Sequence, residues 1–239
     1  MDVVAPTAAD LAIEIGPGEG ALTGELARRA GRLIALEVDR QLIAGLRERF
    51  PGVEILEADA RTWGYARLAR PPGGRVLVVG SLPYSASKPI LGALVAARGA
   101  IDAMALMLQR EVAERVAAPP GSKVYGSLSV LTQLYCDVRI ALRVPPGAFR
   151  PPPKVESAVL ALQPLAAPRV PVPDPRRFEA IVLAAFGKRR KTLANALAAG
   201  LGRPPEEARE AARAAGVDPG RRAETLTILE FAGLAARLS

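Results

Sequence analysis

Short apolar runs alternate with amphipathic stretches over the first two thirds of the chain. The apolar runs are rich in Ile, Leu and Val, which predicts buried strands. They lie at residues 11–15, 32–38, 53–57, 75–79, 103–108 and 157–162, with a further apolar, β-rich run inside 127–144. The stretches between them predict helices at residues 21–29, 39–50, 89–98 and 109–118. This alternation predicts an α/β fold with a mostly parallel sheet and helices on both faces, and the last two runs favour one antiparallel edge pair.

The pattern changes at a proline-rich stretch. Five prolines fall at positions 164, 168, 171, 173 and 175, which predicts an extended linker. After it, every patterned stretch is helical: 178–186, 192–199, 205–215 and 224–238. We therefore expect two domains, an α/β domain over residues 1–165 and a small all-α domain over residues 170–239.

The amino-acid composition limits the kinds of catalysis that the protein can perform. The 239 residues are half apolar, so a sizeable core can form, and we see neither a membrane-spanning run nor a signal peptide. The single cysteine, Cys136, favours a cytoplasmic location. The chain has no histidine, which excludes Ser-His-Asp and Cys-His catalysis, and we expect no metal site.

The net charge of +8 suggests a polyanionic partner, although a high content of arginine alone also explains a basic chain. The distribution is more informative. Residues 166–239 hold 13 Lys and Arg against 8 Asp and Glu, a net of +5 in the smaller part of the chain. The positive charge is therefore concentrated in the predicted helical domain.

A glycine cluster follows the first predicted strand and opens a helix. Gly16, Gly18 and Gly20 are spaced G-x-G-x-G, whereas dinucleotide-binding loops have G-x-G-x-x-G. Glycines let the backbone turn sharply and approach a ligand closely. S-adenosylmethionine has no phosphate and needs this close approach together with carboxylates, although the cluster alone also suits an ordinary strand-to-helix turn.

Two carboxylates end the next two predicted strands. Glu37 can accept hydrogen bonds from both hydroxyls of a ribose, and Asp59 can accept from an adenine amino group. Because the carboxyl ends of parallel strands meet at one edge of a sheet, both are expected beside the glycine cluster. Alternatively, Glu37 is a solvated strand end and Asp59 a helix cap, and an NAD site would use the same ribose contact.

The element after the fourth strand distinguishes a site for S-adenosylmethionine from a site for NAD. Residues 81–84 read Ser-Leu-Pro-Tyr and resemble the (Asn/Asp/Ser)-x-Pro-(Tyr/Phe) motif of methyltransferases that act on nucleobase amino groups. An exocyclic amine is a poor nucleophile, because its lone pair is delocalised into the ring. Oxygen acceptors that hold its N–H groups turn the lone pair toward the methyl donor, which requires positioning and no histidine base. Tyr84 offers a stacking wall for an unstacked base, or is simply a buried tyrosine after a turn.

Four motifs give the chain a specific resemblance. EIGPGEGALT stands at residues 14–23, QREVAER at 109–115, FRPPPKVES at 149–157 and FGKRRKTL at 186–193. Together they resemble the rRNA adenine dimethylase family, which dimethylates adenines of small-subunit ribosomal RNA. The resemblance extends from about residue 10 to about residue 235. It implies a Rossmann-like class I methyltransferase domain, S-adenosylmethionine as cofactor, and 16S rRNA of the small ribosomal subunit as partner, acted on by a monomer.

The resemblance also implies roles for individual residues. The cofactor-binding set is Gly16, Gly18, Gly20, Glu37, Asp59, Ala60 and Ser81. The catalytic set, in which Tyr84 and Phe149 enclose the target base, is Ser81, Leu82, Pro83, Tyr84 and Phe149. The RNA-binding set is Lys188, Arg189, Arg190, Lys191, Arg221 and Arg222. Without the resemblance, Phe149 is a core aromatic and the basic run a solvated helix face.

The chain departs from the family in two places. Ser81 stands where the family has Asn, and serine has the shorter reach. A family segment that covers the cofactor has no counterpart here, so we expect a more open pocket or a truncated sequence. Two further hypotheses therefore stay open: a weakened enzyme that mainly assists ribosome assembly, or a methyltransferase of another nucleobase amine.

Overall fold

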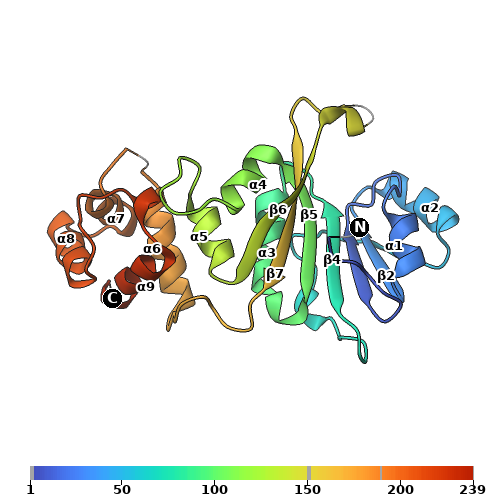
Figure 1. Ribbon diagram of the computed structural model, residues 1–239, viewed down its shortest axis with the longest axis horizontal. Coiled ribbons are helices and arrows are strands. Elements are labelled where there is room, and N and C mark those ends of the chain that lie inside the picture. The colour runs from blue at the N-terminus through green and yellow to red at the C-terminus, as the bar shows by residue number, and fades with distance from the viewer. Residues whose placement is uncertain (1–2, 150–151, 189, 239) are drawn as a thin grey trace. The chain divides into compact units, whose positions relative to one another are not determined.

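A mixed sheet forms the centre of the larger part of the molecule in the computed structural model, which describes residues 3–149, 152–188 and 190–238 (Figure 1). Among these residues, seven strands lie in the order β3-β2-β1-β4-β5-β7-β6. Their bounds are β1 Leu11–Ile15, β2 Arg32–Glu37, β3 Glu54–Glu57, β4 Val76–Ser81, β5 Ala103–Gln109, β6 Cys136–Val144 and β7 Ser157–Pro164. Strands β1 to β5 are parallel, and β7 runs antiparallel between β5 and β6. The predicted α/β fold with an antiparallel edge pair is confirmed.

The strand order reverses beside β1, which pairs with β2 on one side and β4 on the other. Ile15, the last residue of β1, lies opposite Leu36 and Gly80. The carboxyl ends of β1, β2 and β4 therefore meet at one edge of the sheet. Ligands of open α/β sheets bind in the crevice at such a switch point.

Helices cover both faces of the sheet, and every residue of β1 is buried. The helices of this part are α1 Thr23–Arg29, α2 Arg40–Arg49, α3 Ser87–Ala96 and α4 Arg110–Val116, with short turns η1 Tyr65–Arg67, η2 Arg98–Ala100 and η3 Pro146–Ala148. On one face, Leu26 of α1 and Leu46 of α2 pack with Leu33 in a single apolar cluster. Helix α2 begins as predicted, because the Asp39 carboxylate accepts a hydrogen bond from the Gln41 N–H at 2.8 Å.

Residues 127–144 contain the predicted β-rich run as β6, and a helix that was not predicted comes before it. Helix α5 spans Ser127–Gln133 and precedes β6. Ser129 accepts from the Gly126 N–H at 3.0 Å, which satisfies a backbone donor at the start of the helix. Val130 and Leu134 are four residues apart and both fully buried, as helical spacing requires.

The contacts divide the chain into two units, one of Met1–Ala113 with Cys136–Ala166 and the other of Glu114–Tyr135 with Ala167–Ser239. The second unit contains α5, α6 Pro175–Phe186, α7 Leu193–Leu201, α8 Pro205–Ala214, η4 Ala223–Thr225 and α9 Ile228–Arg237. The division differs from the expected one at residues 114–135, because Val130 and Leu134 share a core cluster with Phe178, Ile181 and Phe231. The predicted linker ran from Pro164 to Pro175; Pro164 ends β7, Pro175 begins α6, and residues 165–174 between them form neither helix nor strand.

Two further features of the fold bear on function. No helix among the described residues has the length and apolarity needed to cross a membrane. Cys136, the one cysteine of the sequence, is fully buried at the start of β6.

Candidate active site

The glycine loop lies against the end of β4. Gly16 and Gly18 have φ angles of 64° and 58°, in the left-handed region that favours glycine. A side chain at Gly16 would place its first carbon 3.0 Å from the Ser81 carbonyl oxygen, whereas one at Gly18 would meet nothing within 4 Å. The loop therefore touches the Ser-Leu-Pro-Tyr element at one glycine and leaves open space for a ligand at the next.

Gly20 has a different requirement. Its φ is 85°, and a side chain there would overlap the Phe50 ring. A glycine is therefore required at position 20 by packing within the domain, because no larger residue fits beside Phe50.

Glu37 joins the glycine loop to the end of β2. One carboxylate oxygen, Oε1, accepts from the N–H groups of Val38 at 2.8 Å and Asp39 at 3.0 Å. The other oxygen, Oε2, accepts from the Gly18 N–H at 3.3 Å. The side chain is buried and its orientation is fixed. Oε2 retains acceptor capacity, which suits the hydroxyls of a ribose.

Glu14 is a candidate site residue that the predicted sets omitted. It lies within β1 and is 1 % exposed, and its Oε2 has no hydrogen-bond partner in the described part of the chain. Burial raises the pKa of Glu14 to about 7, with the neighbouring Thr23 hydroxyl opposing and the charge of Glu37 adding to the increase. A buried carboxylate without a partner is unfavourable, and an ammonium group supplies the missing charge and donors. Its signal was an acidic residue inside an apolar strand just before the glycines.

Asp59 carries an internal ion pair. The Arg61 guanidinium contacts its carboxylate at 2.5 and 2.9 Å, and the Arg61 N–H donates to it at 2.8 Å. Arg61 lowers the pKa of Asp59. Next to it, buried Ala60 accepts from the Tyr65 hydroxyl at 2.9 Å, and the Tyr65 ring meets Trp63 edge to face at 4.9 Å. Asp59, the acceptor expected for an adenine amino group, is thus ionised and already paired with the Arg61 guanidinium.

The Ser-Leu-Pro-Tyr element is held at several points. Ser81 ends β4, and the Leu82 N–H donates to the Met107 carbonyl at 3.0 Å while the Leu82 side chain is buried. The Pro83 carbonyl accepts from the Ala86 N–H at 3.0 Å. These contacts fix the backbone that presents the Ser81 hydroxyl.

Tyr84 presents its ring at the surface. Its side chain is among the exposed large apolar ones, at 43 %, and its hydroxyl lies 3.3 Å from the hydroxyl of buried Ser157. The Ser87 hydroxyl donates to the Tyr84 carbonyl at 3.2 Å. Tyr84 is therefore held at its hydroxyl and at its main-chain carbonyl, while the surface of its ring stays available for stacking.

The predicted base-binding loop, residues 149–157, ends at Ser157, which is the first residue of β7 and the residue that contacts the Tyr84 hydroxyl. Arg110 anchors this end: its N–H donates to the Glu156 carbonyl at 2.9 Å and its guanidinium contacts the Glu156 carboxylate at 2.5 Å. Phe149 is half-buried just after η3, and Arg150 and Pro151 lie outside the described residues. Its place opposite Tyr84 stays a prediction.

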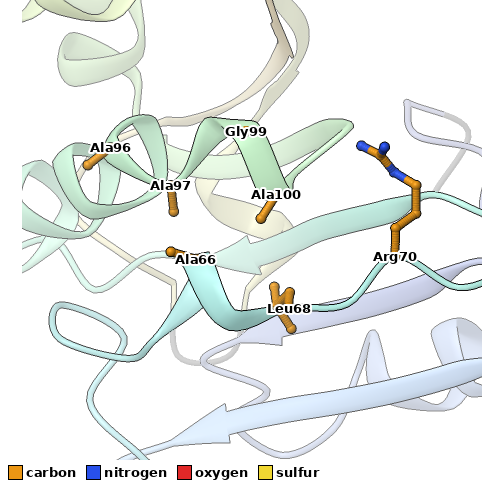
Figure 2. A pocket seen from close by; sticks show the side chains of 7 residues that line it. All are labelled: Ala66, Leu68, Arg70, Ala96, Ala97, Gly99 and Ala100. Atoms are coloured by element: carbon orange, nitrogen blue, oxygen red, sulfur yellow. The ribbon is translucent and has the colours of Figure 1, made fainter.

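A cavity of about 400 Å³ lies elsewhere in this unit, between η1 and η2 (Figure 2). Figure 2 shows that Ala66 and Ala97 point toward each other across it and that Arg70 lies near one end. Arg70 pairs with Asp102, which directly precedes β5, so the cavity lies at the amino ends of the strands. It is therefore separate from the edge that holds Glu37 and Ser81.

Comparison with known families matches residues 2–239 to the model described as ribosomal RNA adenine dimethylase. The chain belongs to this family. Its fold and cofactor are accordingly those of a class I, S-adenosylmethionine-dependent methyltransferase. The unpartnered Oε2 of Glu14 fits that cofactor, whose amino group carries the complementary charge.

Individual relatives agree with the family. This dimethylase is 47 % identical over 98 % of its length to the "Ribosomal RNA small subunit methyltransferase A" of Geobacter metallireducens, covering 86 % of that protein. It is 44 % identical, again over 98 % of its length, to the protein of the same name from Xanthomonas campestris, covering 88 % of it.

Solved structures share the fold. A dimethyladenosine transferase from Plasmodium falciparum superposes with a TM-score of 0.80 at 23 % identity, over 97 % of this chain and 91 % of the other. The 23S rRNA methyltransferase ErmE superposes with a TM-score of 0.71 at 28 % identity, over 99 % and 94 % of the two chains.

The basic residues of the dimethylase divide into two groups. Lys188, Arg190 and Lys191 are exposed between α6 and α7, and Arg189 lies outside the described residues. Arg221 instead pairs with the Glu230 carboxylate and donates to the Thr225 carbonyl at 2.6 Å. Arg222 lies 4.0 Å from Glu224. The charge of Arg221 is therefore already matched within its unit, which the sequence did not indicate.

Proposed function

We propose that this dimethylase transfers methyl groups from S-adenosylmethionine to N6 of two adjacent adenines near the 3′ end of small-subunit rRNA. The observation that carries the proposal is the close approach of the cofactor loop at Gly16 to the carbonyl of Ser81. A methyl donor in the loop and an amine at Ser81 would then be neighbours.

The bound cofactor supplies an electrophilic methyl group, and the protein positions the amine. The Ser81 hydroxyl and a backbone carbonyl of the Ser-Leu-Pro-Tyr element accept the two N–H groups, which turns the nitrogen lone pair toward the methyl. Tyr84, held by Ser157, supports the base from one side. Phe149 would close the other side. Water removes the proton that the amine loses, so no histidine is needed.

The choice of rRNA rests on the relatives. Proteins named for the small subunit are 44–47 % identical over nearly the whole chain, whereas ErmE, named for 23S rRNA, is 28 % identical. We propose that methyl transfer belongs to the first unit, which holds most of the predicted domain of residues 1–165. RNA binding would then belong to the second unit, which holds the predicted helical domain of residues 170–239 with Lys188–Lys191. The enzyme would act as a monomer on cytoplasmic small subunits.

A second candidate function is assembly of the small subunit with little or no methylation. Ser81 favours it, because a serine reaches less far toward a base amine than the asparagine of the family. Binding to subunits would then be retained while turnover is low.

Mass spectrometry of rRNA decides between these functions. Unmethylated small subunits are incubated with the protein and S-adenosylmethionine, and the 3′ region is digested and weighed. Two adjacent dimethyladenosines support the proposal, and no product with the Tyr84→Ala variant ties it to this site. Subunit binding without added methyl groups supports the assembly role. The absence of both binding and methylation contradicts both.

A further inference from the structure

The acceptor sites of the Asp59 carboxylate are all occupied by one neighbouring residue. Oδ1 accepts from the Arg61 main-chain N–H at 2.8 Å and from Arg61 Nε at 3.0 Å. Oδ2 accepts from Nε at 2.9 Å and from Nη2 at 2.5 Å. A carboxylate offers about four lone-pair sites, so these four contacts use all of them. Another N–H donor can therefore bind Asp59 only when Arg61 releases a contact.

The place of Asp59 in the fold indicates which donor that is. Glu57 ends β3 opposite Glu37, and the next residue, Ala58, donates its N–H to the Glu37 carbonyl at 2.9 Å. Asp59 therefore follows the strand end beside the one where Glu37 is expected to bind the ribose. Val38, which comes after Glu37, is 62 % exposed, so an apolar surface is open at the same edge. A base attached to that ribose would lie within this region, and its amino group is the donor expected at Asp59.

The ion pair between Asp59 and Arg61 can open easily. Both side chains are partly exposed, at 34 % and 56 %, and ion pairs in contact with water are weak. Arg61 pairs with no second carboxylate in the part of the chain that the structure describes. Glu57, the other acidic side chain close to it in the sequence, pairs with Arg40 at 2.7 Å. The guanidinium is thus held at Asp59 by this one pair alone.

We propose that Arg61 competes with the adenine amino group of the cofactor for the Asp59 carboxylate, so that cofactor binding must displace its guanidinium. The displacement leaves the main-chain N–H of Arg61 on Oδ1 and frees Oδ2 for the 6-amino group. Arg61 therefore lowers the affinity for adenosine-bearing ligands. The inference rests on the part of the proposed function that concerns the cofactor, because it requires an adenosine at this edge of the sheet.

Calorimetric titration with S-adenosylhomocysteine tests the competition without methyl transfer. Arg61→Met removes the guanidinium and keeps a long side chain. It should bind S-adenosylhomocysteine about 2- to 5-fold more tightly than the wild type, the range expected when an exposed ion pair no longer has to be broken. The difference should shrink as salt is added, because salt weakens the pair in the wild type. Equal or weaker binding by Arg61→Met would overturn the inference.

Arg70→Met is the matched control. The Arg70 guanidinium contacts the Asp102 carboxylate at 3.0 and 2.6 Å, and its side chain is 54 % exposed. This pair lies at the amino ends of the strands, away from Asp59, so its loss should leave the affinity for S-adenosylhomocysteine unchanged. An equal gain in both variants would show a general effect of removing a positive charge and would overturn the competition.

An analogue of S-adenosylhomocysteine with purine in place of adenine identifies the competing group. It lacks the 6-amino group, so the wild type and Arg61→Met should bind it equally. The gain from Arg61→Met should likewise disappear in an Asp59→Ala background, because the two residues act through one contact. A gain that persists with the purine analogue or without Asp59 would overturn the inference.

The inference and the proposed function can fail separately. Tighter binding by Arg61→Met without methylation of small subunits would support the competition and contradict the proposed function. Dimethylated rRNA with unchanged binding by Arg61→Met would support the proposed function and overturn the competition. If neither the wild type nor Arg61→Met binds S-adenosylhomocysteine, both are overturned.

Discussion

The charge of Glu14 should depend on whether a cation occupies the site beside it. Its carboxylate lies behind the glycine loop with one unpartnered oxygen and a pKa raised to about 7. Because the pKa of Glu14 is higher in the folded state than in the unfolded state, the folded state binds more protons than the unfolded state at pH values between the two. The contribution of Glu14 to stability therefore falls between about pH 4.5 and about pH 7 and is constant above.

Glu14→Gln should raise the free energy of unfolding of the ligand-free protein by about 2 kcal/mol at pH 8 and change it little at pH 4.5. It should also weaken cofactor binding, because the ammonium group loses its counter-charge. Thermal unfolding and calorimetric titration with S-adenosylhomocysteine measure the two effects. Glu48→Gln, an exposed change of the same type on α2, should alter neither. A destabilised Glu14→Gln protein at pH 8 would contradict this account.

Ser81→Asn should raise the methylation rate by up to about 10-fold, roughly one additional well-placed hydrogen bond to the base amine. Single-turnover methylation of small subunits measures this, with Ser81→Ala expected to be slower than the wild type. An unchanged or lower rate in Ser81→Asn would mean that serine is not the limiting feature.

Some site residues could be read from the sequence and others could not. Glu37 and the glycines follow from strand ends and spacing, and the hydrogen bond of Gly18 to Glu37 confirms that they meet. The partners of Asp59 and Arg221 are ion pairs whose geometry no pattern of residue types fixes. Glu14 stood within the quoted motif, but its missing partner is visible only once burial is known.

At the scale of elements, β7 links the two halves of the predicted base-binding site. Its first residue, Ser157, contacts the Tyr84 hydroxyl, and Glu156 just before it is anchored by Arg110. Periodicity predicted this strand and its antiparallel partner. It did not predict α5, because seven residues rich in Leu, Val and Thr suit a strand as well as two helical turns.

Ser157→Ala and Tyr84→Phe should each lower the methylation rate about 3- to 10-fold by freeing the Tyr84 ring, with unchanged affinity for S-adenosylhomocysteine. Because both remove the same hydrogen bond, the double variant should be no slower than the slower single one. Multiplicative effects in this double-mutant cycle would show that the contact does not position the ring.

Gly20→Ala should destabilise the protein by about 1–3 kcal/mol, because alanine at this φ is strained and its methyl group would overlap Phe50. Gly45 within α2 is the matched control, since a side chain there meets nothing within 4 Å. Gly45→Ala should stabilise by about 0.4–1 kcal/mol. Denaturant unfolding compares the two. Equal effects would contradict the packing role of Gly20.

At the scale of the molecule, charge is distributed unevenly in the sequence. Residues 166–239 carry a net of +5 of the total +8, whereas the candidate cofactor site is formed around the carboxylates Glu14, Glu37 and Asp59. Polyanion binding and cofactor binding should therefore respond differently to salt.

Affinity for small subunits should fall about 100-fold between roughly 50 and 200 mM salt if about four phosphates are contacted. Affinity for S-adenosylhomocysteine should change much less, because it releases few counterions. Fluorescence titrations over this range measure both. A subunit affinity that is insensitive to salt would count against the basic helical unit as the RNA-binding part.

The burial of Cys136 in the sheet has a practical consequence. Maleimide reagents should find no accessible thiol on the native protein, so cysteines introduced at exposed positions such as Gly52 and Arg213 would be labelled selectively. One such label in each unit would allow spectroscopic distance measurements to follow the two units while the enzyme engages a ribosomal particle.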